Sequence, residues 1–201
     1  DCGPINDLFI SEYIMGSGAN DKAIEIYNGT GEDKDLGSYN LWKISNGGIW
    51  PEQELEFPDI TLAAGDVFVV CRESAYETIL AVCDDTTNSS VMNFNGNDAI
   101  GLAKDGVLID AVGKAGEDPG DGWAVAGISD ATEDHTLVRK TTVVGGNLNW
   151  DASAGTNSDD SEWIVYDIDK FSYLGIFDLV CPEGYTGYTG EDVYLGQTNI
   201  C

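Results

Sequence analysis

The sequence predicts an all-β protein, built as a β-sandwich with a single short helix. Short apolar stretches of period two recur along the 201 residues, and 25 glycines against 5 prolines supply many turns. Only one segment has helical spacing. Hydrophobic residues make up 42% of the chain, with 5 Trp, 9 Tyr and 6 Phe, which is enough apolar side chain to fill a core.

The first strands follow from alternation of apolar and other residues. Over residues 8–14, Leu8, Ile10 and Ile14 alternate with Phe9, Ser11 and Tyr13, and shorter alternating stretches lie at 24–26 and 42–44. Such stretches are typical of half-buried strands. The continuous run at 67–71 is different, because an uninterrupted β-branched stretch predicts a central strand covered on both faces.

The clearest local signal is a hairpin. Apolar residues at 100–102 and 107–109 enclose Asp105 and Gly106. An Asp-Gly pair between two apolar runs predicts a tight turn, because glycine readily takes the positive φ that this turn requires. Further strands are expected at 135–140 and 162–166.

One helix is expected between Ser74 and Cys83. Ser74 and Glu77 have the spacing of a capping box, and Tyr76, Ile79, Leu80 and Cys83 would form one apolar face. The residues at 115–134 and 145–161 are rich in Gly, Asp and Ser and are expected to be long surface loops.

Several motifs together carry a resemblance to a known family. In order, these are LFISEY (8–13), KAIEIYN (22–28), LAAGDV (62–67), NFNGNDA (93–99), DHTLVRK (134–140), NWD (149–151) and EW (162–163). The chain resembles the lamin tail domains of secreted proteins over about 8–178. The resemblance implies an immunoglobulin-like β-sandwich that mediates binding or assembly and carries no shared catalytic chemistry.

The resemblance leaves two flanking segments. Residues 1–7 are expected to form an N-terminal arm, and 179–201 a tail bounded by cysteines. The CPEGYTG motif at 181–187 is similar to the final loop of an epidermal-growth-factor-like module, without the other four cysteines of such a module.

Charge excludes several partners. With 9 Lys+Arg against 36 Asp+Glu, the formal net charge is −27, which repels nucleic-acid phosphates and anionic membrane surfaces. No apolar run approaches the ~20 residues needed to span a bilayer. Screening by salt or neutralisation by divalent cations would relieve the self-repulsion, so calcium is the one cofactor considered.

The five cysteines favour an oxidising compartment. We expect two intrachain disulfides, Cys71–Cys83 and Cys181–Cys201, which leaves Cys2 as a candidate for an intermolecular bond. The sequons at Asn28 and Asn88 are candidate N-glycosylation sites and agree with an extracellular, secreted protein. The start at Asp1 fits a mature chain from which a signal peptide has been removed.

Catalysis is not expected. The only imidazole is His135, which begins a predicted strand and is expected to be a structural hydrogen-bonding residue, and neither a P-loop nor a dinucleotide-binding fingerprint is present. The NFNGND stretch fails the EF-hand pattern, because Asp98 and Lys104 stand where that pattern requires Gly and Glu. Acidic loop residues that could supply calcium oxygens are Asp118, Asp121, Asp130, Glu133, Asp134, Asp159, Asp160 and Glu162.

Glycan binding is the remaining alternative. Its stacking candidates are the five tryptophans, of which Trp50 and Trp123 are the better surface candidates and Trp163 is expected in the core; the other two are Trp42 and Trp150. We expect a secreted, non-catalytic structural or adhesive protein that self-associates into an extracellular filament or matrix. The alternative is a glycan- or calcium-binding accessory module of a secreted enzyme.

Overall fold

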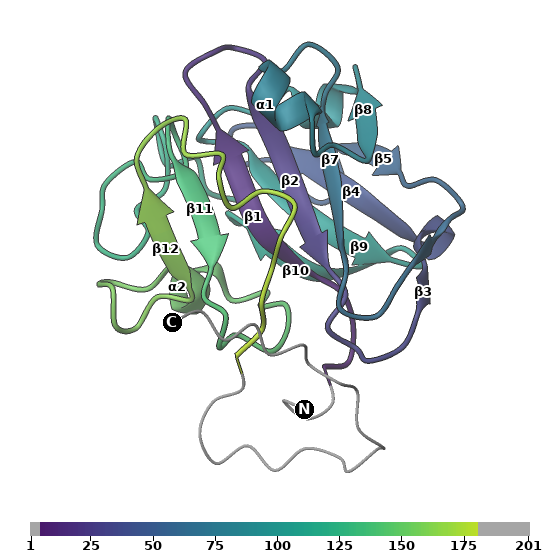
Figure 1. Cartoon of the computed structure of the whole chain (residues 1–201). Coiled ribbons are helices and arrows are strands. Elements are labelled where there is room, and N and C mark those ends of the chain that lie inside the picture. Colours follow the sequence, from purple (N-terminus) through teal and green to yellow (C-terminus); the bar gives the residue numbers. More distant parts are fainter. Residues whose placement is uncertain (1–4, 181–201) are drawn as a thin grey trace, which may run out of the picture.

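The fold was obtained as a computed structural model that describes residues 5–180. Two β-sheets pack face to face, and a two-stranded ribbon lies at one end (Figure 1). The larger sheet has the order β12-β11-β1-β2-β7-β8, and the smaller sheet has the order β10-β9-β4-β5. All pairs are antiparallel except β7 with β8. The predicted all-β sandwich is confirmed.

The larger sheet contains β1 Phe9–Met15, β2 Lys22–Tyr27, β7 Val67–Arg72, β8 Asp85–Thr87, β11 Thr136–Arg139 and β12 Trp163–Tyr166. The smaller sheet contains β4 Tyr39–Ile44, β5 Gln53–Glu56, β9 Ala99–Lys104 and β10 Val107–Val112. The ribbon pairs β3 Lys34–Asp35 with β6 Thr61–Leu62.

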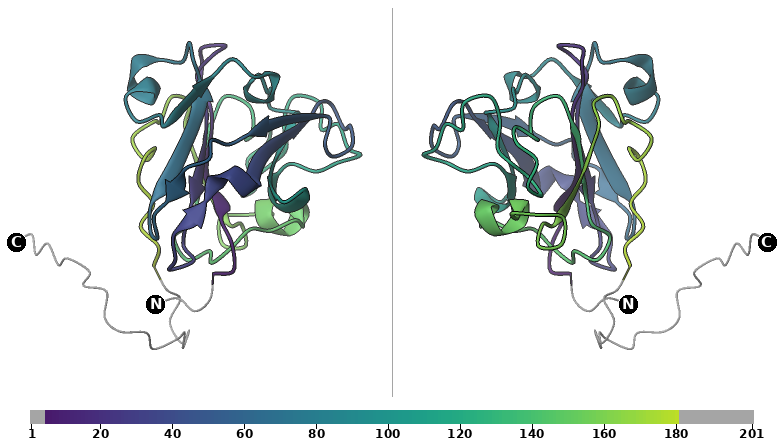
Figure 2. Two further views of the ribbon diagram at one scale, coloured as in Figure 1. Left: turned by 90° about the vertical axis from the view of Figure 1, so that its right-hand side faces the viewer. Right: turned by 90° about the vertical axis from the view of Figure 1, so that its left-hand side faces the viewer.

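Three clusters of apolar side chains hold the molecule together. The main core lies between the two sheets and includes Tyr13, Phe68 and Trp163. A second and a third cluster lie on the outer face of the larger sheet, where α1 Glu77–Leu80 and the last described residues cover it. Figure 2 shows this arrangement edge-on, with the yellow-green end of the described chain on the side of the larger sheet away from the smaller one.

A β-bulge changes the predicted alternation in β1. The register passes from Ile10 opposite Ile26 to Glu12 opposite Glu25, so Ser11 is the extra residue. Ile10 and Tyr13 therefore both face the main core, while Glu12 and Ile14 face outward. The simple alternation read from the sequence is correct before the bulge and wrong after it.

The predicted hairpin is confirmed. Residues Val107 and Lys104 pair across a two-residue turn, and both Asp105 and Gly106 have positive φ, at 49° and 74°. The predicted strands at 135–140 and 162–166 are also confirmed, as β11 and β12.

The helix predictions need correction. Helix α1 is only four residues long, and its N-cap is Tyr76, without a side-chain capping bond, so Ser74 does not form the predicted capping box. The backbone leaves the helix after Leu80 and turns back toward β7. A second helix, α2 Trp150–Ala154, lies within the stretch expected to be a loop, where the Asn149 side chain caps its first turn.

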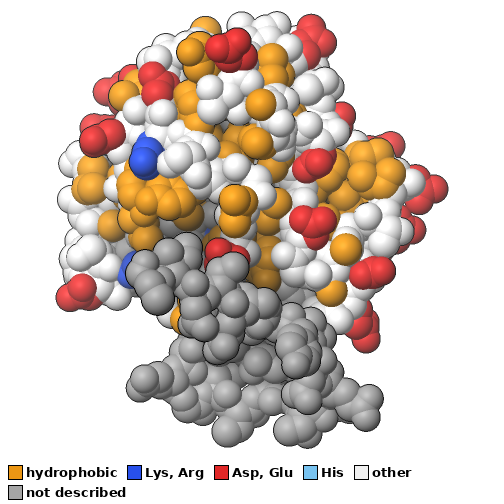
Figure 3. All heavy atoms as spheres, viewed as in Figure 1, with side chains coloured by type: hydrophobic (Ala, Val, Ile, Leu, Met, Phe, Trp, Pro, Cys, Tyr) orange, Lys and Arg blue, Asp and Glu red, His pale blue; other side chains and the backbone are white. Residues whose placement is uncertain are grey.

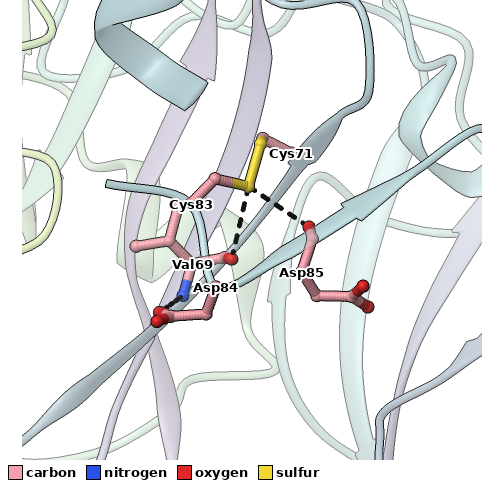
Figure 4. The surroundings of a disulfide bond; sticks show 5 residues. All are labelled: Val69, Cys71, Cys83, Asp84 and Asp85. Atoms are coloured by element: carbon pink, nitrogen blue, oxygen red, sulfur yellow. Dashed lines mark hydrogen bonds between the residues drawn. A yellow bond between two sulfur atoms is a disulfide. The ribbon is translucent and has the colours of Figure 1, made fainter. Parts of the chain in front are cut away.

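The predicted Cys71–Cys83 disulfide is present and joins β7 to the turn after α1 (Figure 4). The Cys83 sulfur lies 3.2 Å from the carbonyl oxygen of Asp85, a contact rather than a hydrogen bond, because a disulfide sulfur carries no proton. Asp84 and Val69 exchange hydrogen bonds of 2.9 Å beside it, one through the Asp84 carboxylate and one between backbones. Together these bonds fix β8 against β7.

Candidate functional site

The most distinctive surface feature is an apolar groove beside the edge of the larger sheet. It has a volume of about 490 Å³ and lies between β11, β12 and the segment that follows them. We call it the β12 groove, and we call residues 171–180 the C-terminal strap. The side chains that matter below are Val138, Ile164, Tyr166, Tyr173, Ile176 and Phe177. In Figure 3 hydrophobic side chains gather over this part of the molecule.

The strand that borders the groove lies at a sheet edge and carries no charged residue. Edge strands are commonly protected from pairing by charged residues. Strand β5 carries Glu54 and Glu56, and β8 begins at Asp85. Strand β12 reads Trp-Ile-Val-Tyr, without a charge, and the side chain of Ile164 is 40% exposed. An uncharged edge of high β-propensity is a template for a further strand.

The backbone of β12 has groups directed to that open edge. The amide of Lys140 donates to the carbonyl of Glu162, so hydrogen-bonded pairs with β11 alternate from this point. By this alternation Ile164 is bonded to β11, whereas the N–H and C=O of Val165 point away from it. The Trp163 amide is already satisfied by the Ser161 hydroxyl at 3.0 Å. Val165 is therefore the first position at which both backbone groups could bond an added strand.

Two lysines border the groove. Lys140 lines it, and the ammonium of Lys170 lies 5.4 Å from the centre of the Tyr173 ring. Neither lysine has a carboxylate partner among the described residues, and the Lys140 ammonium donates instead to the Ser158 carbonyl. In a chain with net charge −27, these two lysines place positive charge beside a groove that is also lined by one carboxylate, Asp178.

Tyr166 and Tyr173 both line the groove. Their rings stack with centres 4.7 Å apart. A hydrogen bond with Tyr173, followed by burial, raises the pKa of Tyr166 to about 12. The Tyr166 phenol is therefore neutral at ordinary pH, and the contact between the two rings joins β12 to the C-terminal strap.

Below the strap lie two buried carboxyl groups, Glu12 on β1 and Glu25 on β2. Each residue is only 1% exposed. The Glu25 carboxylate accepts hydrogen bonds from the Ser11 hydroxyl and from the Gly175 amide, both at 2.6 Å. Neither oxygen of Glu12 has a hydrogen-bond partner. Burial first, and the charge of Glu25 second, raise the pKa of Glu12 to about 9.

A buried ion pair supports the same edge from the core side. The Arg139 guanidinium, from β11, binds both oxygens of Asp110, from β10, at 2.8 and 3.0 Å. Both residues are fully buried, and Arg139 also donates to the Ile10 carbonyl and to Glu162. This pair connects the two sheets directly.

The sequence analysis did not single out these four charged residues. Glu12, Glu25, Asp110 and Arg139 all stand inside apolar strands, and that placement is the one signal by which they could have been found. A charged residue flanked by apolar ones is more often exposed on the polar face of a strand.

Of the acidic loop residues named from the sequence, only those around Glu133 lie close together. Burial first, and the nearby charges of Asp121, Asp134 and Asp130 second, raise the pKa of Glu133. Residues of the other two sets have other hydrogen-bond partners. Asp118 accepts from the Gly120 amide, Asp160 accepts from Thr156 and Asn157, and Glu162 belongs to the Arg139 network. Within residues 5–180, no three His, Cys, Asp or Glu side chains converge as a metal site would require.

The tryptophans do not form an exposed platform for glycans. Trp42, Trp123, Trp150 and Trp163 are buried, so the expectation that Trp123 lies on the surface is wrong. Trp123 and Trp150 pack edge to face with ring centres 6.3 Å apart, because the loop that carries Trp123 folds back over the core. Trp50 is half-buried against the main core.

The two sequons differ sharply. Asn28 is fully buried, and its amide nitrogen donates to the carbonyls of Glu32, Leu62 and Ala63. A glycan on this nitrogen would displace those bonds, so Asn28 does not fit the predicted glycosylation. Asn88 is exposed and remains a candidate. His135 lies before β11, with its Nδ1 atom 2.6 Å from the Glu133 carbonyl oxygen.

The predicted intermolecular bond of Cys2 and the predicted Cys181–Cys201 disulfide lie outside the described residues. So does the motif at 181–187 that is similar to a growth-factor-like module. In the part of the chain that the structure covers, no helix has the length and apolar character to cross a bilayer.

Comparison with known proteins identifies a matching family model and a similar solved structure. A family model described as Lamin Tail Domain matches residues 3–116, which is more than half of the chain and includes β1 to β10. Among solved structures, the chain is similar to a DUF4876 family protein from Bacteroides thetaiotaomicron, with 13% identity and a TM-score of 0.45. That match covers 92% of this chain and 75% of the other. A search of curated proteins found no match.

Proposed function

The chain belongs to the lamin tail domain family, and we propose that it is a non-catalytic assembly module of an extracellular structure. In this proposal the β12 edge and groove bind a second copy of the same chain. The copy adds a strand to the larger sheet, and its apolar side chains enter the groove. Repetition of this contact gives a filament or matrix if the contact does not close on itself.

The observation that carries the proposal is the uncharged, open edge of β12 next to an apolar groove. The unpaired lysines beside it favour an acidic partner, and this chain is itself strongly acidic. Like charge on the two copies opposes the contact at long range, and salt screens that repulsion. Assembly should therefore strengthen as ionic strength rises.

Secretion is part of the same proposal. The Cys71–Cys83 disulfide and the exposed Asn88 sequon are features typical of proteins from oxidising compartments. Cys2 supplies a candidate covalent bond between copies. The alternative, an accessory module that binds glycans or calcium, receives no specific support from the described residues.

The test compares two lysine substitutions on exposed edge residues. Ile164→Lys places a charge on the β12 edge, and Val107→Lys, at a residue 63% exposed on β10, is the matched control. Sedimentation velocity over a range of concentrations should show that wild type self-associates. We expect Ile164→Lys to raise the half-association concentration at least tenfold, and Val107→Lys to leave it unchanged.

Two results would contradict the proposal. If wild type stays monomeric at all concentrations and salt strengths, the assembly proposal is wrong and the accessory-module alternative takes its place. Equal weakening by both variants would show that the contact does not use β12. Cys2→Ser should remove covalent multimers on non-reducing gels without changing the fold.

A further inference from the structure

Glu12 is a buried carboxyl group without any partner. Both of its oxygens are shielded from solvent and lack a hydrogen-bond donor. A carboxylate anion in such surroundings is far less stable than the protonated acid, because burial removes its hydration and nothing replaces it. The folded state therefore holds a proton at this position.

The groups around Glu12 reinforce this preference. Glu25 faces it from β2, Tyr166 faces it from β12, and Val138, opposite it on β11, is uncharged. Asp84 adds negative charge near Glu25, and Tyr173 reaches the site through its stacking with Tyr166. No ion pair among the described residues includes Glu12 or Glu25.

Glu25 differs from Glu12 because it has donors. Burial raises its pKa, while the Ser11 hydroxyl and the Gly175 amide oppose that rise. Glu25 is thus the member of the pair that accommodates a negative charge, and its bond to Gly175 ties the strap to the sheet. The strap is further seated by Leu174 in the second cluster and by Phe177 in the third.

We propose that Glu12 makes the seating of the C-terminal strap dependent on pH. While Glu12 is protonated, the strap stays on the larger sheet, and ionisation of Glu12 beside Glu25 releases it. Since Tyr173, Ile176 and Phe177 line the β12 groove, release also removes one side of that groove and should weaken the binding of a second copy there. The consequence for assembly rests on the proposed function, whereas the movement of the strap does not.

The Glu12 pKa of about 9 implies that about one molecule in ten is ionised at pH 8 and about one in a hundred at pH 7. The closed strap should therefore dominate at neutral pH. Opening should increase steeply above pH 8.

The experiment measures how fast chymotrypsin cleaves the strap of the full-length chain, with products mapped by mass spectrometry to Phe171, Tyr173 and Phe177. Wild type and Glu12→Gln are compared at the same pH, so that the protease's own pH dependence cancels in their ratio. Glu54→Gln, at an exposed carboxylate on β5, is the matched control. We expect a wild-type to Glu12→Gln ratio near one at pH 6.5, rising at least tenfold by pH 9.5, with Glu54→Gln behaving as wild type.

A ratio that stays flat with pH would overturn the proposal. If Glu12→Gln does not fold, carbon-13 NMR of the wild-type Glu12 carboxyl decides. If the Glu12 carboxyl titrates with a midpoint above pH 8, and strap cleavage has the same midpoint, the proposal is supported. If the Glu12 carboxyl titrates in the ordinary range of carboxyl groups, the proposal is refuted. Both measurements are made at concentrations where the chain is monomeric, so they are separate from the self-association test.

Discussion

The Arg139–Asp110 pair offers a direct test of how the two sheets are held together. Asp110→Asn keeps the shape of the side chain but removes its charge. The two Asp110 oxygens also accept from the amides of Ile10, Ala111 and Asn147, so the new NH₂ group faces backbone donors in either orientation. Breaking one partner of a buried ion pair costs about 3–5 kcal/mol, because the other charge is left uncompensated.

For a chain of this length, that loss corresponds to a fall in Tm of roughly 10 °C. Urea denaturation followed by tryptophan fluorescence would measure the free energy of unfolding directly. The matched control is Asp151→Asn. The Asp151 side chain is 76% exposed and pairs with Lys114. An exposed pair contributes about 1 kcal/mol or less. If Asp110→Asn costs no more than Asp151→Asn, the pair does not clamp the sheets and the reasoning fails.

Two further substitutions address stability. The folded state holds a proton on Glu12 that the unfolded state releases above about pH 4.5, so the free energy of unfolding should fall as pH rises toward 9. Glu12→Gln should remove roughly 3–4 kcal/mol of that fall between pH 5 and 8. Urea titrations at each pH would measure the difference. An unchanged pH slope would show that Glu12 titrates normally. Replacing both Cys71 and Cys83 by Ser should cost about 2–3 kcal/mol, given their separation of 12 residues, and the same titrations with and without reductant would check it. A double variant as stable as wild type would mean that the backbone bonds of Asp84 already fix this turn.

Much of the fold was predictable because its signals are local. The Asp105–Gly106 turn and the apolar run of β7 each identify a structure within a few residues. The bulge at Ser11 was not predictable, because it depends on how β1 registers against β2, and a one-residue insertion leaves no mark in the composition. Helix α2 was missed because five residues contain too little periodicity to separate them from a loop.

The candidate site was harder to predict for a different reason. Ile164 is a candidate binding residue only because β12 lies at the edge of its sheet. The order of strands in a sheet depends on the whole chain, so it cannot be read from the residues around Ile164. The partnership of Arg139 with Asp110 likewise joins strands of different sheets. The polar neighbours of Trp123 predict a surface position, yet the Trp123 ring packs against Trp150.

The place of β1 in the larger sheet has a consequence for synthesis. Strand β1 lies between β2 and β11, so one of its edges is completed by residues made much later, and the Arg139 contact with Ile10 spans 129 positions. At about 5–20 residues per second, a growing chain exposes that edge for roughly ten seconds. A message truncated before β11 would leave it open permanently. Such shortened products should pair with one another through β1 and aggregate rather than persist as a smaller domain.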